Sequence, residues 1–419
     1  MISFQNTNLK KILLGTFEIG KSTILNKGAQ LIFLIYLSTF KSVEEFSIYI
    51  EFVLFTEILG IFLAHGANSS ILKGNLAENI NKNLLISTIL VLVSTALLFM
   101  ISEVLRLEIF KTFNITIYVI IASPIIAINS IFRSAAISEK DINKYSNSIR
   151  YSNLVLLIYP FFDFFIEDLP IEIAFIFIIL GNIISILLLG YFKRNIISKF
   201  GSKDFIEYFW ASSPFFVRNN MGTLTKNLGL LNISVSGSIS NLSGYGLVNR
   251  IFEQVGQTLS IVTLQIIPQL RDAMQEKNLK NISSYLSIIL YLFFAVGLLG
   301  SIGIGILFSM INIINPNAWI LDFIIESYIL LYAVSIGFIK SNLASWEFLK
   351  QKYTGFLIIF IELLLLVSAF FLYYYLHESY GALGVAIAYA ILSTLNFIIN
   401  LCLFFYFRSF SLSRNKVTT

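Results

Sequence analysis

Residues 15–22 read Gly-Thr-Phe-Glu-Ile-Gly-Lys-Ser and fill every fixed position of a phosphate-binding loop. In such a loop the glycines let the backbone approach phosphate, and Lys21 and Ser22 would hold the phosphates and a magnesium ion. The loop works only between a strand and a helix of an α/β domain. No hydrophilic stretch after residue 22 is long enough for that domain, which takes about 50 residues or more. We attribute the match to coincidence, and Lys21 needs another explanation.

The composition points to a polytopic membrane protein. Of the 419 residues, 57% are hydrophobic and only 13% are charged, whereas soluble proteins carry about 25% charged residues. A bilayer core takes about 20 mostly apolar residues per helix. We therefore expect an all-α integral membrane protein with twelve transmembrane helices, at about 12–38, 46–71, 84–104, 115–137, 149–166, 171–192, 208–235, 244–269, 283–311, 322–347, 353–376 and 381–407.

The basic residues alternate between the two sides of this arrangement. With the N-terminus inside, nineteen of the 29 Lys and Arg residues fall on the inner side, whereas the outer segments hold only Lys41, Arg106 and Lys111. Lys and Arg are enriched in cytoplasmic loops. The alternation therefore predicts a multi-pass protein of the cytoplasmic membrane with both termini in the cytoplasm. The net charge of +5 follows from this topology and gives no indication of nucleic-acid binding.

Charged residues inside the predicted spans are the strongest candidates for function. Each cation at a helix centre costs about 2.5–3.5 kcal/mol on insertion scales, so a functional role is the first hypothesis. The seven basic residues in spans are Lys21, Lys27, Arg133, Arg218, Lys226, Arg250 and Lys340. The acidic residues considered with them are Glu18, Glu51, Glu57, Glu253, Glu326, Glu347 and Glu362.

Polar residues gather on single faces of three of these helices. The first face carries Glu18, Ser22, Asn26 and Gln30, with Lys21 beside it; the second carries Arg218, Asn219, Thr225 and Lys226; the third carries Arg250, Glu253, Gln254 and Gln257. Exposure of such polar faces to lipid is unfavourable, so we expect them to line a water-filled cavity. The alternative is that the charges form buried neutral pairs three residues apart, such as Arg250 with Glu253.

A weak internal repeat indicates two similar halves. An offset of 199 residues places Lys27 over Lys226 and Glu51 over Arg250. We expect two six-helix lobes, 1–206 and 207–419, related by a pseudo-twofold axis along the membrane normal. The helices with the most cations would then flank the cleft between the lobes.

Two stretches resemble one transporter family. Residues 24–67 contain Glu44-Glu45-Phe46-Ser47-Ile48-Tyr49 in a short turn after the first helix, and residues 243–270 form a second-lobe equivalent with Pro268 late in the helix. In these stretches the chain resembles the Wzx-type polysaccharide (O-antigen) flippases of the multidrug/oligosaccharidyl-lipid/polysaccharide exporter superfamily. Ser47 departs from the glycine usual in that turn.

The resemblance implies a MATE-like exporter fold and a flippase activity. The substrate would be an undecaprenyl-pyrophosphate-linked oligosaccharide, an O-antigen or capsule repeat unit of lipopolysaccharide biosynthesis. It would pass from the inner to the outer leaflet of a bacterial inner membrane by alternating access. The partners implied are this lipid-linked oligosaccharide, membrane lipids and a polysaccharide polymerase.

The intramembrane charges suit such a ligand. Cations lower the barrier for a pyrophosphate, and arginine offers it a bidentate fork. We expect substrate contacts from Lys21, Lys27, Arg218, Lys226 and Arg250. The candidate carboxylates for coupling to a proton or sodium counter-ion are Glu57, Glu253 and Glu362. Ion pairing alone is an equally open interpretation of these three.

Two other function classes compete with this one. A multidrug exporter of the same superfamily is the nearest alternative, although its cationic substrates favour acidic or aromatic cavities. A membrane-embedded glycosyltransferase or polymerase would need a large outer loop, which the sequence lacks. His65 and His377 stand without neighbours at metal-ligand spacing. We therefore expect no enzyme activity, no catalytic residue, no metal and no cofactor.

Overall fold

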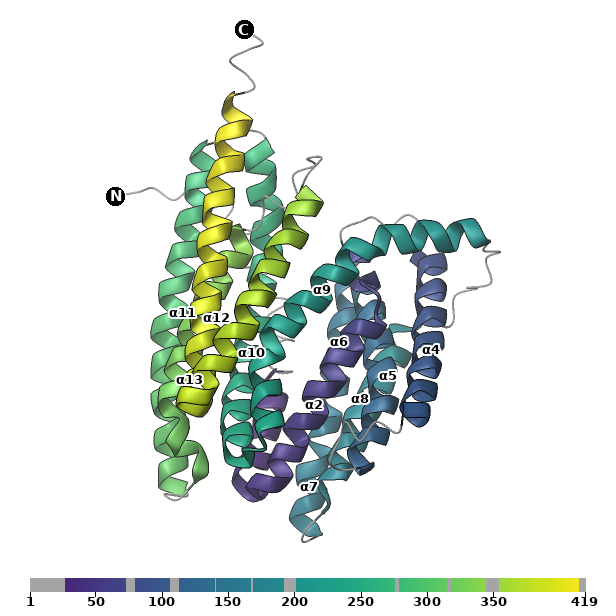
Figure 1. Cartoon of the computed structure of the whole chain (residues 1–419), viewed down its shortest axis with the longest axis vertical. Helices are drawn as coiled ribbons and strands as arrows, with labels where there is room; N and C mark the ends of the chain where they lie inside the picture. The colour runs from purple at the N-terminus through teal and green to yellow at the C-terminus, as the bar shows by residue number, and fades with distance from the viewer. Residues whose placement is uncertain are drawn as a thin grey trace. The chain divides into compact units, whose positions relative to one another are not determined.

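The computed structural model describes an all-helical chain (Figure 1). It covers residues 27–72, 80–105, 113–139, 141–166, 169–191, 201–275, 279–314, 318–343 and 354–413. A helix spans Lys27–Phe40. The other helices are α2 (Val43–Leu63), α3 (Ala67–Leu72), α4 (Ile80–Leu105), α5 (Phe113–Ser138), α6 (Ile142–Leu156), α7 (Ile158–Phe165), α8 (Ile171–Leu189), α9 (Ser202–Ser236), α10 (Ile239–Gln275), α11 (Leu279–Ile314), η2 (Trp319–Phe323), α12 (Ile324–Leu343) and α13 (Thr354–Ser413).

The predicted all-α membrane architecture is confirmed. The described part of the first expected span is the helix Lys27–Phe40, and every later expected span overlaps described helices. The span expected at 149–166 is divided into α6 and α7, and the last two spans are the halves of α13. Seven described helices are long and apolar enough to cross a membrane. The polar helices α9 and α10 are not among these seven, as expected from their charged faces.

The chain folds as two compact units. One spans Leu25–Asn227 and is called the N-terminal unit below; the other includes Leu228–Thr419 and is called the C-terminal unit. The boundary falls within α9, which therefore contributes residues to both units. The predicted lobes 1–206 and 207–419 stay a prediction.

The acidic segment 44–49 lies in a helix, not in the turn predicted from the family resemblance. α2 begins at Val43 because Ser42 and Glu45 form a capping box: the Ser42 hydroxyl accepts from the Glu45 backbone N–H at 3.2 Å, and the Glu45 carboxylate accepts from the Ser42 N–H at 3.1 Å. Two backbone donors that a helix start leaves free are thereby satisfied. The turn is confined to residues 41 and 42.

A left-handed corner separates α2 from α3. His65 has φ 49° and Gly66 has φ 72°, a backbone region that suits glycine and is uncommon for other residues. A Cβ added to Gly66 would clash with the backbone nitrogen of Phe216 and would lie 2.7 Å from the carbonyl oxygen of Ser212. The corner thus lets the α9 backbone pack directly on that of the N-terminal unit.

The last two spans are joined by a glycine. α13 is helical on both sides of Gly381, whose φ of 59° and ψ of −133° break the helix. The chain turns sharply at this point (Figure 1). The helix continues beyond residue 376, the end predicted from the sequence, because the break needs a residue that tolerates positive φ.

Each unit has its own apolar core. In the N-terminal unit the core includes Ala67, Ile131, Phe132, Tyr191 and Tyr208, with α6 packed against α8 and α5 against α2 and α8. In the C-terminal unit it includes Leu270, Ile289, Phe338, Leu365 and Phe404, with α12 packed against α10, α11 and α13.

A buried ion pair fixes the α7–α8 end of the N-terminal unit. The Lys41 ammonium donates to the Asp163 carboxylate and to the Leu169 carbonyl, both at 2.9 Å. Asp163 also accepts from the Tyr36 hydroxyl at 2.8 Å and from the Leu169 N–H at 3.0 Å. Only 5% of each paired side chain is exposed. Every partner of this pair is satisfied within the unit, which indicates a structural role.

Breaking this pair should destabilise the protein strongly. Asp163→Asn leaves the buried Lys41 charge uncompensated, which typically costs about 3–5 kcal/mol. We expect a large drop in melting temperature in detergent. The control is Glu172→Gln at the start of α8, where we expect little change. Equal melting temperatures for the two variants would show that the pair does not hold this end together.

The close packing of α8 on α6 depends on Gly181. A Cβ on Gly181 would lie 2.5 Å from the carbonyl oxygen of Ser152 in α6. By contrast, Gly297 and Gly303 of the glycine-rich α11 have nothing within 4 Å of an added Cβ. The α11 glycines at these two positions therefore make no close packing contact.

Gly181→Ala should push α6 and α8 apart. Overpacking of this kind costs about 1–3 kcal/mol. We expect a lower melting temperature and a broader size-exclusion peak than for the native protein. Gly297→Ala is the matched control and should leave both unchanged or raise stability slightly. A Gly181→Ala variant as stable as Gly297→Ala would contradict the packing described here.

Candidate functional site

The N-terminal unit holds an ion pair between α2 and α9. The Lys226 ammonium lies 3.3 Å from the Glu57 carboxylate, and 31% and 25% of the two side chains are exposed. They are 169 residues apart in sequence, so only the fold brings them together. Both were predicted site residues, one as a substrate cation and the other as a coupling carboxylate. The structure makes each the partner of the other.

Amide and hydroxyl groups extend this polar region across three helices. The Asn219 side chain of α9 donates to Asn68 of α3 at 3.2 Å, and Asn68 donates to Ser130 of α5 at 3.4 Å. Arg218 is half-buried on the same stretch of α9 and has interactions of its own. The predicted polar face of α9 therefore contacts other polar groups in its own unit.

The helix Lys27–Phe40 joins this unit through its polar side. The Lys27 ammonium donates to Gln30 at 3.1 Å, and Gln30 donates to Asn153 of α6 at 2.9 Å. Lys27 was predicted to contact substrate, and here its ammonium is engaged by an amide one turn along. The predicted site residue Lys21 lies outside the described residues.

Arg133 of α5 forms a polar site that sequence reasoning did not select. Its guanidinium donates to the hydroxyls of Ser152 on α6, at 3.0 Å, and Ser185 on α8, at 3.1 Å. Ser185 in turn donates to Asn129 at 2.7 Å, and Asn129 donates to Asn182 at 2.6 Å. The four-residue spacing of Asn129 and Arg133 on one helix face was the signal that could have revealed it.

The C-terminal unit contains a second, more buried ion pair. Arg250 and Glu253 of α10 are joined at 2.5 Å, with 6% and 8% of their side chains exposed. Asn249 donates to the same carboxylate at 3.4 Å. This is the neutral pairing that we kept open as the alternative for Arg250. The third candidate carboxylate, Glu362, is half-buried on α13.

Two of the intramembrane cations, Lys226 and Arg250, are thus paired with a carboxylate of their own unit. Of the four described cations predicted to bind substrate, Lys226 and Arg250 each contact a glutamate, and Lys27 contacts a glutamine. Pairing removes much of the positive potential that would attract an anion. The partner of each of these three side chains belongs to the same unit as the side chain itself.

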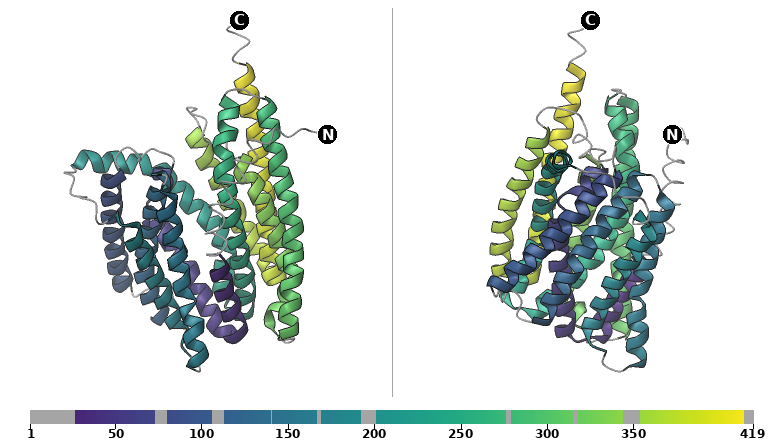
Figure 2. Two further views of the ribbon diagram at one scale, coloured as in Figure 1. Left: turned by 180° about the vertical axis from the view of Figure 1, so that it is seen from behind. Right: turned by 90° about the vertical axis from the view of Figure 1, so that its right-hand side faces the viewer.

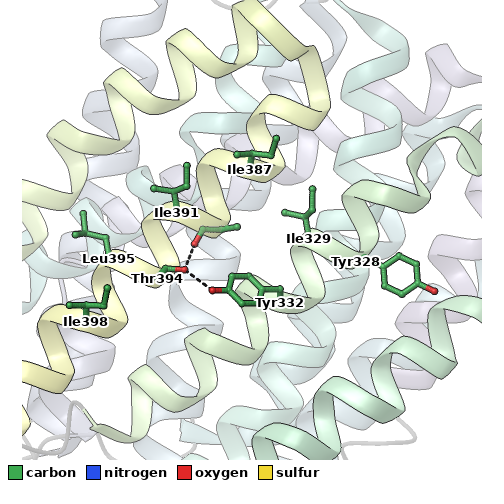
Figure 3. Close-up of a pocket in the computed structure, with 9 residues that line it drawn as sticks. Tyr328, Ile329, Tyr332, Ile387, Ile391, Thr394, Leu395 and Ile398 are labelled. Carbon is green, nitrogen blue, oxygen red and sulfur yellow. Dashed lines mark hydrogen bonds between the residues drawn. The ribbon is translucent and has the colours of Figure 1, made fainter.

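An open apolar groove lies in the C-terminal unit between α12 and the second half of α13 (Figure 3). Its lining is Tyr328, Ile329, Tyr332, Ile387, Ala390, Ile391, Thr394, Leu395 and Ile398. The Tyr332 and Thr394 hydroxyls meet at 3.1 Å in the groove. Figure 3 shows that this pair is surrounded by aliphatic side chains. The groove offers hydroxyls and apolar surface, without a charge.

His65 contacts two neighbouring helices in the described structure. The His65 ring lies 2.9 Å from the Ser94 hydroxyl and stacks on Phe216 with ring centroids 5.7 Å apart. Among the described residues, no group of three or more His, Cys, Asp or Glu side chains could hold a metal ion.

Solved structures of MATE transporters share this fold. An inward-facing multidrug resistance MATE family transporter of the MOP superfamily matches with a TM-score of 0.71 at 14% identity, over 94% of this chain and 96% of its own. A variant of the Vibrio cholerae MATE transporter VcmN matches with a TM-score of 0.65 at 12% identity, over 95% and 97% of the two chains. A MOP superfamily transporter from Pyrococcus furiosus, described as having a binding pocket of reverse polarity, matches with a TM-score of 0.60 at 14% identity, over 95% and 96%.

At this level of identity the likeness establishes the fold alone. No family model and no curated protein matches the sequence. The predicted MATE-like exporter fold is therefore confirmed, whereas assignment to the polysaccharide flippases within the superfamily remains a prediction.

The Arg250–Glu253 pair can be tested by replacing its members singly and together. Arg250→Met leaves a buried carboxylate unpaired, and such changes cost about 3–5 kcal/mol. The double replacement Arg250→Met with Glu253→Gln removes both charges, so we expect it to recover most of the lost melting temperature. A double variant no better than Arg250→Met would show that the two side chains do not compensate each other.

Proposed function

We propose that this chain is a multi-pass membrane transporter that exports amphipathic organic molecules by alternating access. The observation that carries the proposal is the match of almost the whole chain to multidrug MATE transporters solved in inward-facing and outward-facing conformations. The export direction and the class of substrate are carried over from those proteins as part of the proposal.

The electrostatics of the described residues favour an uncharged or weakly charged binding surface. The Glu57–Lys226 and Arg250–Glu253 pairs are each neutral. The groove between α12 and α13 combines aliphatic side chains with the Tyr332–Thr394 hydroxyl pair. A ligand with an apolar body and one hydrogen-bonding group would match this lining, as is common for small-molecule sites.

A second candidate is the transfer of a lipid-linked oligosaccharide. It is favoured by residues 24–67, which resemble the Wzx-type flippases, and by the cations Lys27 and Arg218 on helices with polar faces. For this substrate a polysaccharide polymerase would be the next partner, and the bacterial inner membrane the location. The Pyrococcus furiosus protein shows that pocket polarity is not uniform among proteins of this fold.

Export is expected to be coupled to a proton or sodium gradient. Of the three candidate carboxylates, Glu57 and Glu253 are engaged by cations. A carboxylate that exchanges a cationic side chain for a proton or sodium ion could link substrate movement to the ion gradient. Glu57 is the better placed of the two, since a quarter of its side chain is exposed.

Transport in a defined system distinguishes the two candidates. We expect a bacterial strain without its own drug exporters to accumulate less of several fluorescent amphipathic dyes when it produces this protein. In a flippase-deficient strain we expect no restoration of surface glycan. Restored glycan without dye efflux would establish the second candidate in place of the first.

Removing the hydroxyl pair in the groove should weaken export of hydrogen-bonding dyes. One net hydrogen bond contributes about 0.5–1.5 kcal/mol, so Tyr332→Phe with Thr394→Val should raise KM between about twofold and tenfold. The control is Tyr374→Phe on the first half of α13, which lies outside the groove. Unchanged KM in the double variant would exclude the groove from the substrate path.

A further inference from the structure

The first three turns of α9 differ from a membrane span. We expected the seventh helix to begin at residue 208, but α9 begins at Ser202. Figures 1 and 2 show this first part of α9 running across the end of α4 at a steep angle to it. A span would instead run alongside its neighbours. Residues 202–213 therefore need another environment.

One stripe of this segment is fixed to α4. Asp204 forms an ion pair with Lys82, and the Tyr208 hydroxyl lies 2.6 Å from that of Ser87. Ser212 continues the same stripe one turn later and is 2% exposed, as the four-residue spacing requires. The hydrogen bond from Lys82 holds the pKa of Asp204 below its usual value, so the Asp204 carboxylate stays ionised at neutral pH.

The adjacent face of the segment is apolar and exposed. The exposed fractions are 37% for Phe205, 55% for Ile206, 52% for Phe209 and 71% for Trp210. At 100° per residue, these four side chains occupy one side of the helix, next to the stripe that packs on α4. Three large aromatic side chains side by side are an unusual surface to leave in water.

The third face carries charge. Lys203 and Glu207 are both exposed and lie beyond Trp210 around the helix. The segment thus has a packed stripe, an apolar face and a charged face in succession. An apolar face rich in Trp and Phe beside a charged face is the pattern of helices that lie in the membrane interface.

We propose that residues 202–213 form an interfacial anchor that lies in the headgroup region of the inner leaflet. Phe205, Ile206, Phe209 and Trp210 would enter the boundary between headgroups and acyl chains, to a depth of about 5–10 Å. The side follows from the distribution of Lys and Arg, which places residues 193–207 in the cytoplasm. The occupant is therefore lipid.

The anchor would hold the start of α9 at a fixed height in the membrane. The Lys82 and Ser87 contacts join it to α4, and the α2–α3 corner receives the α9 backbone at Gly66. The inference concerns membrane contact only and stands whichever substrate the protein carries.

Tryptophan fluorescence tests the anchor in the full-length protein. Of its three tryptophans, Trp319→Phe and Trp346→Phe leave Trp210 as the reporter. The protein is reconstituted into phosphatidylcholine–phosphatidylglycerol vesicles whose acyl chains carry bromine near the headgroup or near the chain end. We expect blue-shifted emission, greater loss of fluorescence with bromine near the headgroup, and little quenching by aqueous iodide.

A matched control reports the charged face of the same helix. Adding Trp210→Phe and Glu207→Trp to the same background moves the reporter by three residues, and we expect quenching by iodide but not by brominated lipid. Strong iodide quenching of Trp210 without lipid quenching would overturn the proposal by placing the face in water. Protection of Trp210 from both quenchers would overturn it by showing that protein covers the face.

A spin label gives the same information without changes to tryptophan. In a Cys402→Ser background, a label at Phe209→Cys should collide more often with oxygen than with a water-soluble nickel complex. The reverse order of collision rates would contradict lipid contact.

Discussion

Lipid hydrocarbon cannot solvate a charge or an open hydrogen bond, and this constraint organises the described structure. Inside the bilayer each polar group needs a partner from the protein or from a water-filled cavity. Lys226 with Glu57, Arg250 with Glu253, and Arg133 with two serines are three such solutions. Each joins groups within one unit. The break between α2 and α3 follows the same constraint, because the backbone of α9 packs on the corner at Gly66.

The pairing of Lys226 and Arg250 with glutamates bears on the kind of substrate that the protein would bind. Cations that each faced open water would favour a phosphate-bearing lipid head, as the sequence alone indicated. Cations that contact carboxylates contribute little net potential and fit a less charged ligand better. The apolar groove with its Tyr332–Thr394 hydroxyl pair agrees with this view.

Hydropathy and charge distribution predicted the helices well because lipid imposes a length and a composition on every span. They could not locate breaks such as His65–Gly66, because a left-handed corner depends on a neighbouring helix rather than on local composition. The spacing of Arg250 and Glu253 permitted a pair, and the structure forms it. The Glu57–Lys226 pair could not be foreseen, since 169 residues separate its members. Arg133 was recognised as an intramembrane cation, but its serine partners on α6 and α8 depend on tertiary packing.

Exchanging the charges of Glu57 and Lys226 tests the central claim most directly, because only tertiary packing brings these two residues together. Glu57→Lys and Lys226→Glu alone each place like charges together, whereas the double exchange restores opposite charges at the same distance. We predict that either single variant loses thermal stability and that the double variant regains most of it. A double variant as unstable as the worse single variant would contradict the claim that Lys226 is neutralised by the Glu57 carboxylate of its own unit.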